Sequence, residues 1–134
     1  FKGRFSKGIS KKNSVIKVLN LLDKNDFLKG KKYSIRIKKN IPQKSGMGGG
    51  SMNAASILSF FLNKKIINFY FAKKFAKEIG FDVILGLNNK TKILYSDNFI
   101  EEVNKKIAFH IILVKPNFGN STKKVYFKNK TFSW

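Results

Sequence analysis

The sequence predicts an α+β domain. Two segments, residues 51–63 and 68–79, carry apolar residues at helical spacing, and Tyr33–Lys39 alternates apolar and polar residues as a strand does. These segments do not follow the regular strand–helix–strand order of an α/β protein, which leaves α+β as the class. A chain of 134 residues, 43% hydrophobic and 14% aromatic, fits one domain with a buried core.

The first predicted helix covers Asn13–Leu22, where valine, isoleucine and leucine recur at helical spacing. Either Ser10 or Asn13 could cap its N-terminus. The second, Ser51–Asn63, is apolar on most of its sides, so we expect it to be largely buried. The third runs from about Asn68 to Ile79, with apolar residues spaced four apart.

Two further expectations concern this third helix. Gly80 follows it directly, where a glycine in the left-handed conformation often ends a helix. The helix also carries an aromatic cluster, which we assign to the core rather than to a platform for stacking bases. The cluster consists of Phe69, Tyr70, Phe71 and Phe75.

Five segments are candidates for extended structure. Tyr33–Lys39 reads as a half-buried strand. Asp82–Leu87 and Thr91–Tyr95 are expected to be short strands or a turn, and Lys106–Val114 is expected to be a strand. Thr122–Phe127 fits either another strand or the start of a helix.

Composition excludes several classes of site. The chain has no cysteine, so it forms no disulfide and no thiolate metal site. It has one histidine, His110, which we expect to be a half-buried strand residue rather than a metal ligand. No apolar run approaches the roughly 20 residues of a membrane span, so we expect no membrane-spanning segment. These features fit a cytoplasmic protein.

The net charge of +21 would attract nucleic acid or anionic lipid. However, the 28 basic residues include only two arginines, Arg4 and Arg36, and the lysines are spread along the whole chain. Base readout and bidentate phosphate binding usually recruit arginine. We therefore interpret the charge as compositional drift at tolerant surface positions, and keep a nucleic-acid-binding module as an alternative.

A glycine loop separates the strand at Tyr33–Lys39 from the apolar helix at Ser51–Asn63. Its glycines allow backbone conformations closed to other residues and let N–H groups approach a ligand. The helix that follows adds unpaired N–H groups and the positive end of its dipole, which suit a phosphate. Ser51 could add a hydroxyl group, and Lys44 a positive charge at the rim.

Two familiar glycine motifs do not fit this loop. A Walker A loop requires Gly-Lys-Ser/Thr, which does not occur in the chain. The dinucleotide fingerprint requires a third glycine where Ser51 stands, and an acidic residue about 20 positions further on, where none is found.

The segment from Pro42 to Ala55 resembles the phosphate-binding motif of the GHMP kinase superfamily, P-x-x-x-G-L-G-G-G-S-S-[DN]-A-A. Gly80-Phe81-Asp82-Val83 resembles the family's G-A-D-V segment, which carries its catalytic aspartate. Further similarities lie upstream at residues 12–15, at Leu62-Asn63 and downstream at residues 117–126. The triple glycine followed by serine is most similar to the branch that phosphorylates a cytidine-diphosphate-linked methylerythritol.

This resemblance implies a ribosomal protein S5 domain 2-like fold for residues 1–134, as a partial N-terminal ATP-binding domain that runs into the C-terminal domain after about residue 115. It implies Asp82 as the catalytic residue and Mg²⁺-ATP as cofactor, with Ser51 near the metal. The implied reaction phosphorylates the 2-hydroxyl of 4-diphosphocytidyl-2-C-methyl-D-erythritol, in non-mevalonate isoprenoid biosynthesis. The implied ATP-binding residues are Pro42, Gln43, Lys44, Ser45, Gly46, Met47, Gly48, Gly49, Gly50, Ser51 and Met52.

The sequence departs from the family pattern at several points. Met52 replaces the second serine of the motif, and Ile84 stands where proline usually follows the aspartate segment. The family's N-terminal lysine segment and its third motif are not found, so we expect this chain alone to be inactive. Three alternatives stay open: a related kinase for mevalonate, homoserine or a sugar, a degenerate non-catalytic relative, and the nucleic-acid-binding module.

Overall fold

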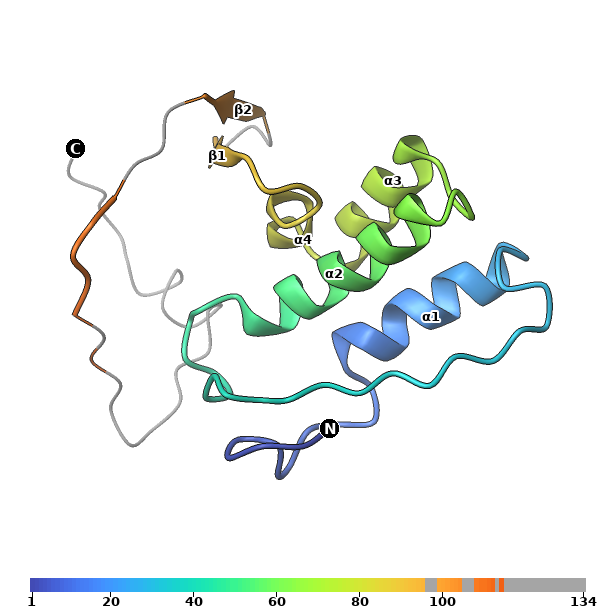
Figure 1. Cartoon of the computed structure of the whole chain (residues 1–134), viewed down its shortest axis with the longest axis horizontal. Coiled ribbons are helices and arrows are strands. Elements are labelled where there is room, and N and C mark those ends of the chain that lie inside the picture. Colours follow the sequence, from blue (N-terminus) through green and yellow to red (C-terminus); the bar gives the residue numbers. More distant parts are fainter. Residues whose placement is uncertain (96–98, 105–107, 113, 115–134) are drawn as a thin grey trace, which may run out of the picture.

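The computed structural model describes residues 1–95, 99–104, 108–112 and 114 of the chain. The described residues form four helices followed by one antiparallel pair of strands (Figure 1). This combination confirms the α+β class. The elements are α1 (Ser14–Lys24), α2 (Gly49–Asn63), α3 (Phe69–Ile79), α4 (Asp82–Leu85), β1 (Thr91–Leu94) and β2 (Ile100–Val103).

Helix α2 forms the centre of the core, as its apolar sequence predicts. It packs against α1, α3 and α4 (Figure 1). Its buried residues are Ala54, Ala55, Ile57, Leu58 and Phe61. Each neighbouring helix contributes a narrower apolar stripe, with Val18 and Leu22 from α1, Phe75 from α3 and Val83 from α4 among the fully or almost fully buried residues.

Asparagine side chains cap two of the three long helices. The Asn13 side chain accepts hydrogen bonds from the N–H groups of Val15 and Ile16, at 3.0 and 3.2 Å. The Asn68 side chain likewise accepts from the N–H group of Phe71, at 3.1 Å. Of the two cap candidates for α1, Asn13 is therefore the one used.

The segment after α3 differs from its prediction. Gly80 has φ 163° and ψ 142°, which is extended backbone, so the expected left-handed conformation is wrong. Asp82–Leu87 was expected to be a short strand or a turn; Asp82–Leu85 forms one helical turn, so the strand alternative is wrong. The Val83 N–H group donates to the Gly80 carbonyl at 2.9 Å, which starts this turn.

The predicted strand at Tyr33–Lys39 is confirmed only in its pattern of burial. Half-buried residues alternate with exposed ones along it, but its residues form no strand. Its one β-bridge joins Lys38 to Lys2 in parallel, supported by the N–H group of Lys39 donating to the Lys2 carbonyl at 2.6 Å. A strand needs a hydrogen-bonded neighbour along its whole length, and among the described residues only residues 2–5 form backbone hydrogen bonds with this segment.

The described part of the chain ends with a hairpin and then residues 108–112 and 114. β1 pairs with β2 antiparallel, with Lys92 opposite Glu102, which confirms a strand within Thr91–Tyr95. The described residues of the predicted strand at Lys106–Val114 belong to no strand, and their side chains are exposed. His110 is exposed as well, so its expected half-burial is wrong. Thr122–Phe127 lies outside the described residues.

The aromatic cluster of α3 is only half in the core. Phe75 is 1% exposed, and the ring of Phe71 packs edge-on against Phe27 with centroids 4.8 Å apart. Phe69 and Tyr70 are 54% and 68% exposed, so their assignment to the core is wrong. They occupy the first turn of α3.

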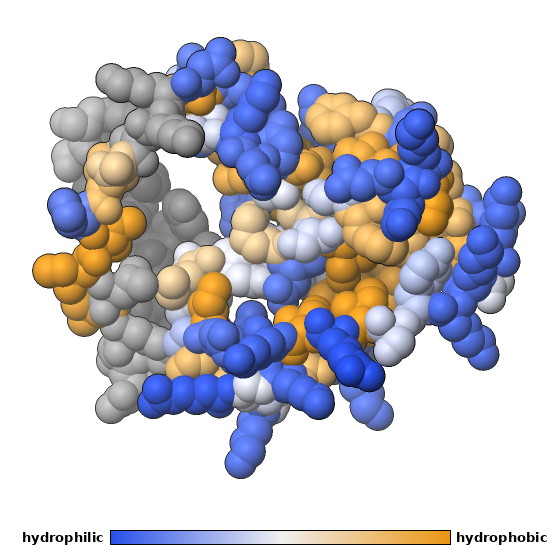
Figure 2. Space-filling view, in the orientation of Figure 1, coloured by the Kyte–Doolittle hydropathy of each residue, from blue (hydrophilic) through white to orange (hydrophobic). Residues whose placement is uncertain are grey.

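The hydrophilic residues form no single continuous patch on the face shown in Figure 2, where apolar surface lies between them around the helical part. Within the part of the chain that the structure describes, no helix combines the length and the apolar character needed to cross a membrane.

Candidate functional site: the glycine loop and the helix that begins at Asp82

The glycine loop reaches α2 through residues in the left-handed conformation. Lys44, Gly46 and Gly48 have φ values of 54°, 72° and 61°. No atom lies within 4 Å of the place where a Cβ on Gly46 or Gly48 would stand. Glycine is therefore favoured at these two positions by the backbone conformation and not by crowding. Met47, between them, is 42% exposed.

The N-terminus of α2 lacks the side-chain cap that α1 and α3 possess. Its cap position is Gly48, and the first turn holds no acidic residue. The first helical hydrogen bond runs from the Met52 N–H group to the Gly48 carbonyl, at 2.9 Å. The preceding N–H groups of the first turn are thus free for an outside acceptor, and the helix dipole favours an anion there.

Lys39 adds a positive charge at this helix end. Its ammonium nitrogen lies 3.1 Å from the position that a Cβ on Gly49 would occupy. The sequence analysis missed this residue. The signal was present, because Lys39 shares the odd-numbered, half-buried face of the extended segment with Tyr33, Ile35 and Ile37.

Three hydrogen bonds connect the loop and the first turn of α2 to earlier parts of the chain. The Gln43 side-chain amide donates to the carbonyls of Phe5 and Lys7, at 3.2 and 2.6 Å. The Ser14 hydroxyl, at the start of α1, donates to the Gly50 carbonyl at 2.7 Å. Gln43 is thus engaged with backbone in this structure, while Ser14 orients the first turn of α2.

Asp82 is the first residue of α4 and is exposed. The next two residues, Val83 and Ile84, are buried and fix the helix to the core. Behind them, Gly86 lies so close to α2 that a Cβ there would stand 2.7 Å from the Cβ of Ala55 and 2.8 Å from the sulfur of Met52.

Met52 therefore connects the two predicted parts of the site. It ends the glycine motif, and its side chain packs on the segment that carries Asp82. Gly86 has no side chain, which leaves the space that the Met52 side chain fills. The structure thus brings the first turns of α2 and the end of α4 together.

The described residues offer no protein site for a metal ion. They contain no group of three or more histidine or acidic side chains that could hold one. Ser51 is half-buried in the first turn of α2, beside the free N–H groups. A metal at this place would need ligands from a bound molecule, as the phosphate oxygens of a nucleotide provide.

A cavity of about 370 Å³ lies elsewhere, between the extended segment and the middle of α2. Tyr33, Arg36, Ser56 and Phe60 are among its lining residues. None of the predicted ATP-binding residues, nor Asp82, lines it. This cavity and the predicted chemistry are therefore separate.

Comparison with known proteins bears on both the loop and Asp82. The sequence profile of the GHMP kinases N terminal domain matches residues 13–88, which include the loop and Asp82. The 4-diphosphocytidyl-2-C-methyl-D-erythritol kinase of Pelagibacter ubique is 53% identical over 99% of this chain and 48% of its own length. The enzymes of the same name from Fusobacterium nucleatum and Thermoanaerobacter pseudethanolicus are 37% and 33% identical, over 86% and 87% of this chain and 40% of their own lengths.

No solved structure matches the chain. The chain spans about half the length, or less, of the curated relatives it matches. The profile match covers more than half of the 134 residues and runs from the cap of α1 to the residue after Leu87. The chain belongs to the GHMP kinase family, and residues 13–88 match that family's N-terminal domain.

Proposed function

We propose that this chain carries the ATP-binding part of a kinase that phosphorylates the 2-hydroxyl of 4-diphosphocytidyl-2-C-methyl-D-erythritol. The observation that carries the proposal is the uncapped, glycine-led N-terminus of α2 with the Lys39 ammonium group beside it. The names of the relatives support the choice of acceptor. The fold that we propose for the complete domain is ribosomal protein S5 domain 2-like.

The nucleotide's phosphates fit this helix end for physical reasons. Free N–H groups at the start of α2 donate to phosphate oxygens, and the glycines let those oxygens come close to the backbone. Lys39 and Lys44 supply positive charge, and Ser51 supplies a hydroxyl for a phosphate oxygen or a metal-bound water. ATP supplies the phosphoryl group, and Mg²⁺ neutralises its charge when bound.

Asp82 has the role of accepting the proton of the substrate hydroxyl, or of orienting that hydroxyl toward the phosphate. Its exposed position at the start of α4 leaves the carboxylate accessible to a substrate. The core contacts of Val83 and Ile84 keep the backbone of α4 fixed beneath it. Positioning of this kind accounts for most of the catalysis in phosphoryl transfer.

The nucleotide site is tested by calorimetry with ATP and Mg²⁺. Gly49→Asp introduces bulk and negative charge at the first position of α2, so saturable binding should disappear. Asn20→Asp is the control, because it adds the same negative charge at an exposed position of α1, outside the loop. Equal ATP affinity in Gly49→Asp and the parent chain would mean that the loop does not bind the nucleotide.

Asp82 is tested by the Asp82→Asn variant of the full-length protein, assayed for transfer from ATP to the cytidine-linked substrate. We expect kcat to fall by about 10²- to 10⁴-fold, the usual contribution of a general base, while ATP binding persists. Asp26→Asn, at an exposed aspartate after α1, is the control and should keep full activity. Transfer to mevalonate or homoserine instead of the cytidine-linked substrate would overturn the acceptor and leave the site intact.

A further inference from the structure

Helix α4 is too short to be stable by itself. It comprises Asp82–Leu85, a single turn, and isolated helices of this length do not persist in water. Its orientation must therefore come from the contacts around it. On the side of the core, Val83 and Ile84 are buried, Gly86 packs on Met52, and the Ser59 hydroxyl donates to the Leu87 carbonyl at 3.1 Å.

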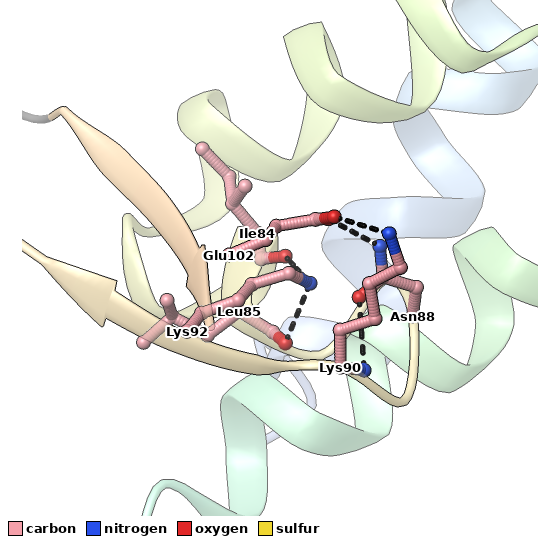
Figure 3. Close-up of polar contacts among 6 residues, drawn as sticks. All are labelled: Ile84, Leu85, Asn88, Lys90, Lys92 and Glu102. Carbon is pink, nitrogen blue, oxygen red and sulfur yellow. Dashed lines mark hydrogen bonds and ion pairs between the residues drawn. The ribbon is translucent and has the colours of Figure 1, made fainter. Parts of the chain in front are cut away.

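Lys92 provides a contact from the opposite direction. Its ammonium group extends from β1 and donates to the Leu85 carbonyl at 3.1 Å, with the Ile84 carbonyl at 3.5 Å (Figure 3). These carbonyls end α4: the Ile84 carbonyl also accepts from the Leu87 N–H group at 3.2 Å, whereas Lys92 is the donor to the Leu85 carbonyl. A positive charge at the C-terminal end of a helix also interacts favourably with the helix dipole.

The surroundings hold Lys92 in this place. Burial lowers its pKa, while the negative charge of Glu102 raises it and Lys90 lowers it. Glu102 is the cross-strand neighbour of Lys92, and its carboxylate accepts hydrogen bonds from Lys90 at 2.6 Å and Asn88 at 2.9 Å (Figure 3). A lysine that gives up part of its hydration for two carbonyls is held more firmly than a surface lysine, whose side chain moves freely.

We propose that Lys92 is a positioning residue of this site, whose ammonium group fixes the C-terminal end of α4 and thereby the orientation in which that helix presents Asp82. The inference rests on the proposed function for the role of Asp82. Because α4 has only one turn, a tilt at Leu85 changes the direction of the side chain at Asp82 directly. Displacements of about 1 Å at a catalytic group can cost roughly 10²-fold in rate.

The test uses three variants of the full-length protein. Lys92→Met keeps the apolar stem of the side chain and removes the charge, while Lys92→Arg keeps a charged donor. Lys90→Met is the matched control, because Lys90 also contacts Glu102 but makes no recorded contact with α4. Hydrogen exchange at the amides of Gly86 and Leu87, which close the last bonds of this turn, reports the anchoring without any need for activity.

We expect Lys92→Met to speed exchange at these two amides at least several-fold and to lower kcat by about 10- to 100-fold, with the KM for ATP little changed. Lys92→Arg should restore most of both quantities, and Lys90→Met should alter neither. Exchange rates in Lys92→Met equal to those in Lys90→Met would overturn the anchoring. Faster exchange with kcat unchanged, in a protein that Asp82→Asn inactivates, would overturn the positioning role.

The two proposals fail in different ways. If Asp82→Asn retains full activity, the proposed role of Asp82 is wrong, whatever Lys92→Met does to the amides. If Asp82→Asn is inactive and Lys92→Met is fully active, the proposed function stands and the role of Lys92 is wrong.

Discussion

Helix α2 and the segment at residues 108–112 are both rich in large apolar side chains, yet their surroundings are opposite. Leu58 and Phe61 of α2 are 0% and 1% exposed, whereas Phe109 and Ile112 are 75% and 91% exposed. In Figure 1 the described residues of the later segment run apart from the helices. A helix satisfies its backbone hydrogen bonds internally and needs only neighbours for its side chains. An extended segment needs neighbours for both.

The largest expected effect is a difference in stability between one variant in each of these two regions. Phe61→Ala removes a ring that packs between Tyr33, at 5.0 Å between centroids, and the core. We expect it to lower the free energy of unfolding by about 3–5 kcal/mol, from lost burial and the cavity left behind. Ile112→Ala, the counterpart in the exposed segment, should stay within about 0.5 kcal/mol of the parent.

Urea unfolding followed by circular dichroism measures both changes. Equal losses from the two variants would mean that residues 108–112 pack on the core in solution, and the contrast between the regions would then be lost.

The difference between these regions also explains what the sequence could predict. The three long helices and the cap at Asn13 follow from local spacing, which the chain carries within each segment. The alternation at Tyr33–Lys39 correctly predicted which of its residues are half-buried and which are exposed. Whether the segment pairs as a strand depends on a neighbouring segment, which local spacing cannot reveal. Lys39 became a candidate only when the segment was seen to end beside Gly49. The loop was indicated as a phosphate site by its glycines and the helix that follows them. The assignment of Asp82 rested on its similarity to a family motif, since proton transfer leaves no periodic signal.

The second prediction concerns the junction of α2 and α4. Gly86→Ala places a Cβ 2.7 Å from Ala55 and 2.8 Å from the sulfur of Met52, so the two helices must move apart. Overpacking of this kind costs about 1–3 kcal/mol. Gly80→Ala is the control, because Gly80 is extended and has no atom near its Cβ position. Thermal unfolding should show a clear loss for Gly86→Ala and little change for Gly80→Ala.

A double variant sharpens this result. Met52→Ser removes the flexible sulfur but leaves Ala55 in place, so it should restore only part of the stability that Gly86→Ala loses. Complete restoration would mean that α4 rests on Met52 alone.

The third prediction tests how far a helix depends on its own sequence. Asn13→Ala removes the side chain that accepts from the N–H groups of Val15 and Ile16, at a cost of about 1 kcal/mol. Asn20→Ala, on the exposed side of the same helix, should be neutral or slightly stabilising because alanine is the better helix former. Chemical denaturation distinguishes the two. No loss from Asn13→Ala would mean that packing against α2 alone determines where α1 begins.

The smallest expected effect concerns the hairpin of β1 and β2. Its backbone is paired, as in a helix, but its side chains are only partly buried. Hydrogen bonds from Lys90 and then Asn88 lower the pKa of Glu102 below its ordinary value of 4.5, and burial opposes them. A carboxyl group whose pKa is depressed by folding contributes stability that is fully present above its unfolded pKa and is lost as the pH falls through its folded pKa. The contacts around Glu102 should therefore weaken only below about pH 4.5.

Amide chemical shifts of β1, followed from pH 6 to pH 3, measure this loss. The signals of Thr91–Leu94 should move in the acid range, while those of Leu58 and Phe61 in the core stay constant. Glu102→Gln should remove the transition, because the amide keeps a carbonyl acceptor but does not titrate. A transition that persists unchanged in Glu102→Gln would assign it to another carboxyl group. Movement of the core signals in the same pH range would mean that the hairpin and the core unfold as one unit. The contact from Lys92 of β1 to α4 would then stabilise the whole domain, in addition to orienting Asp82.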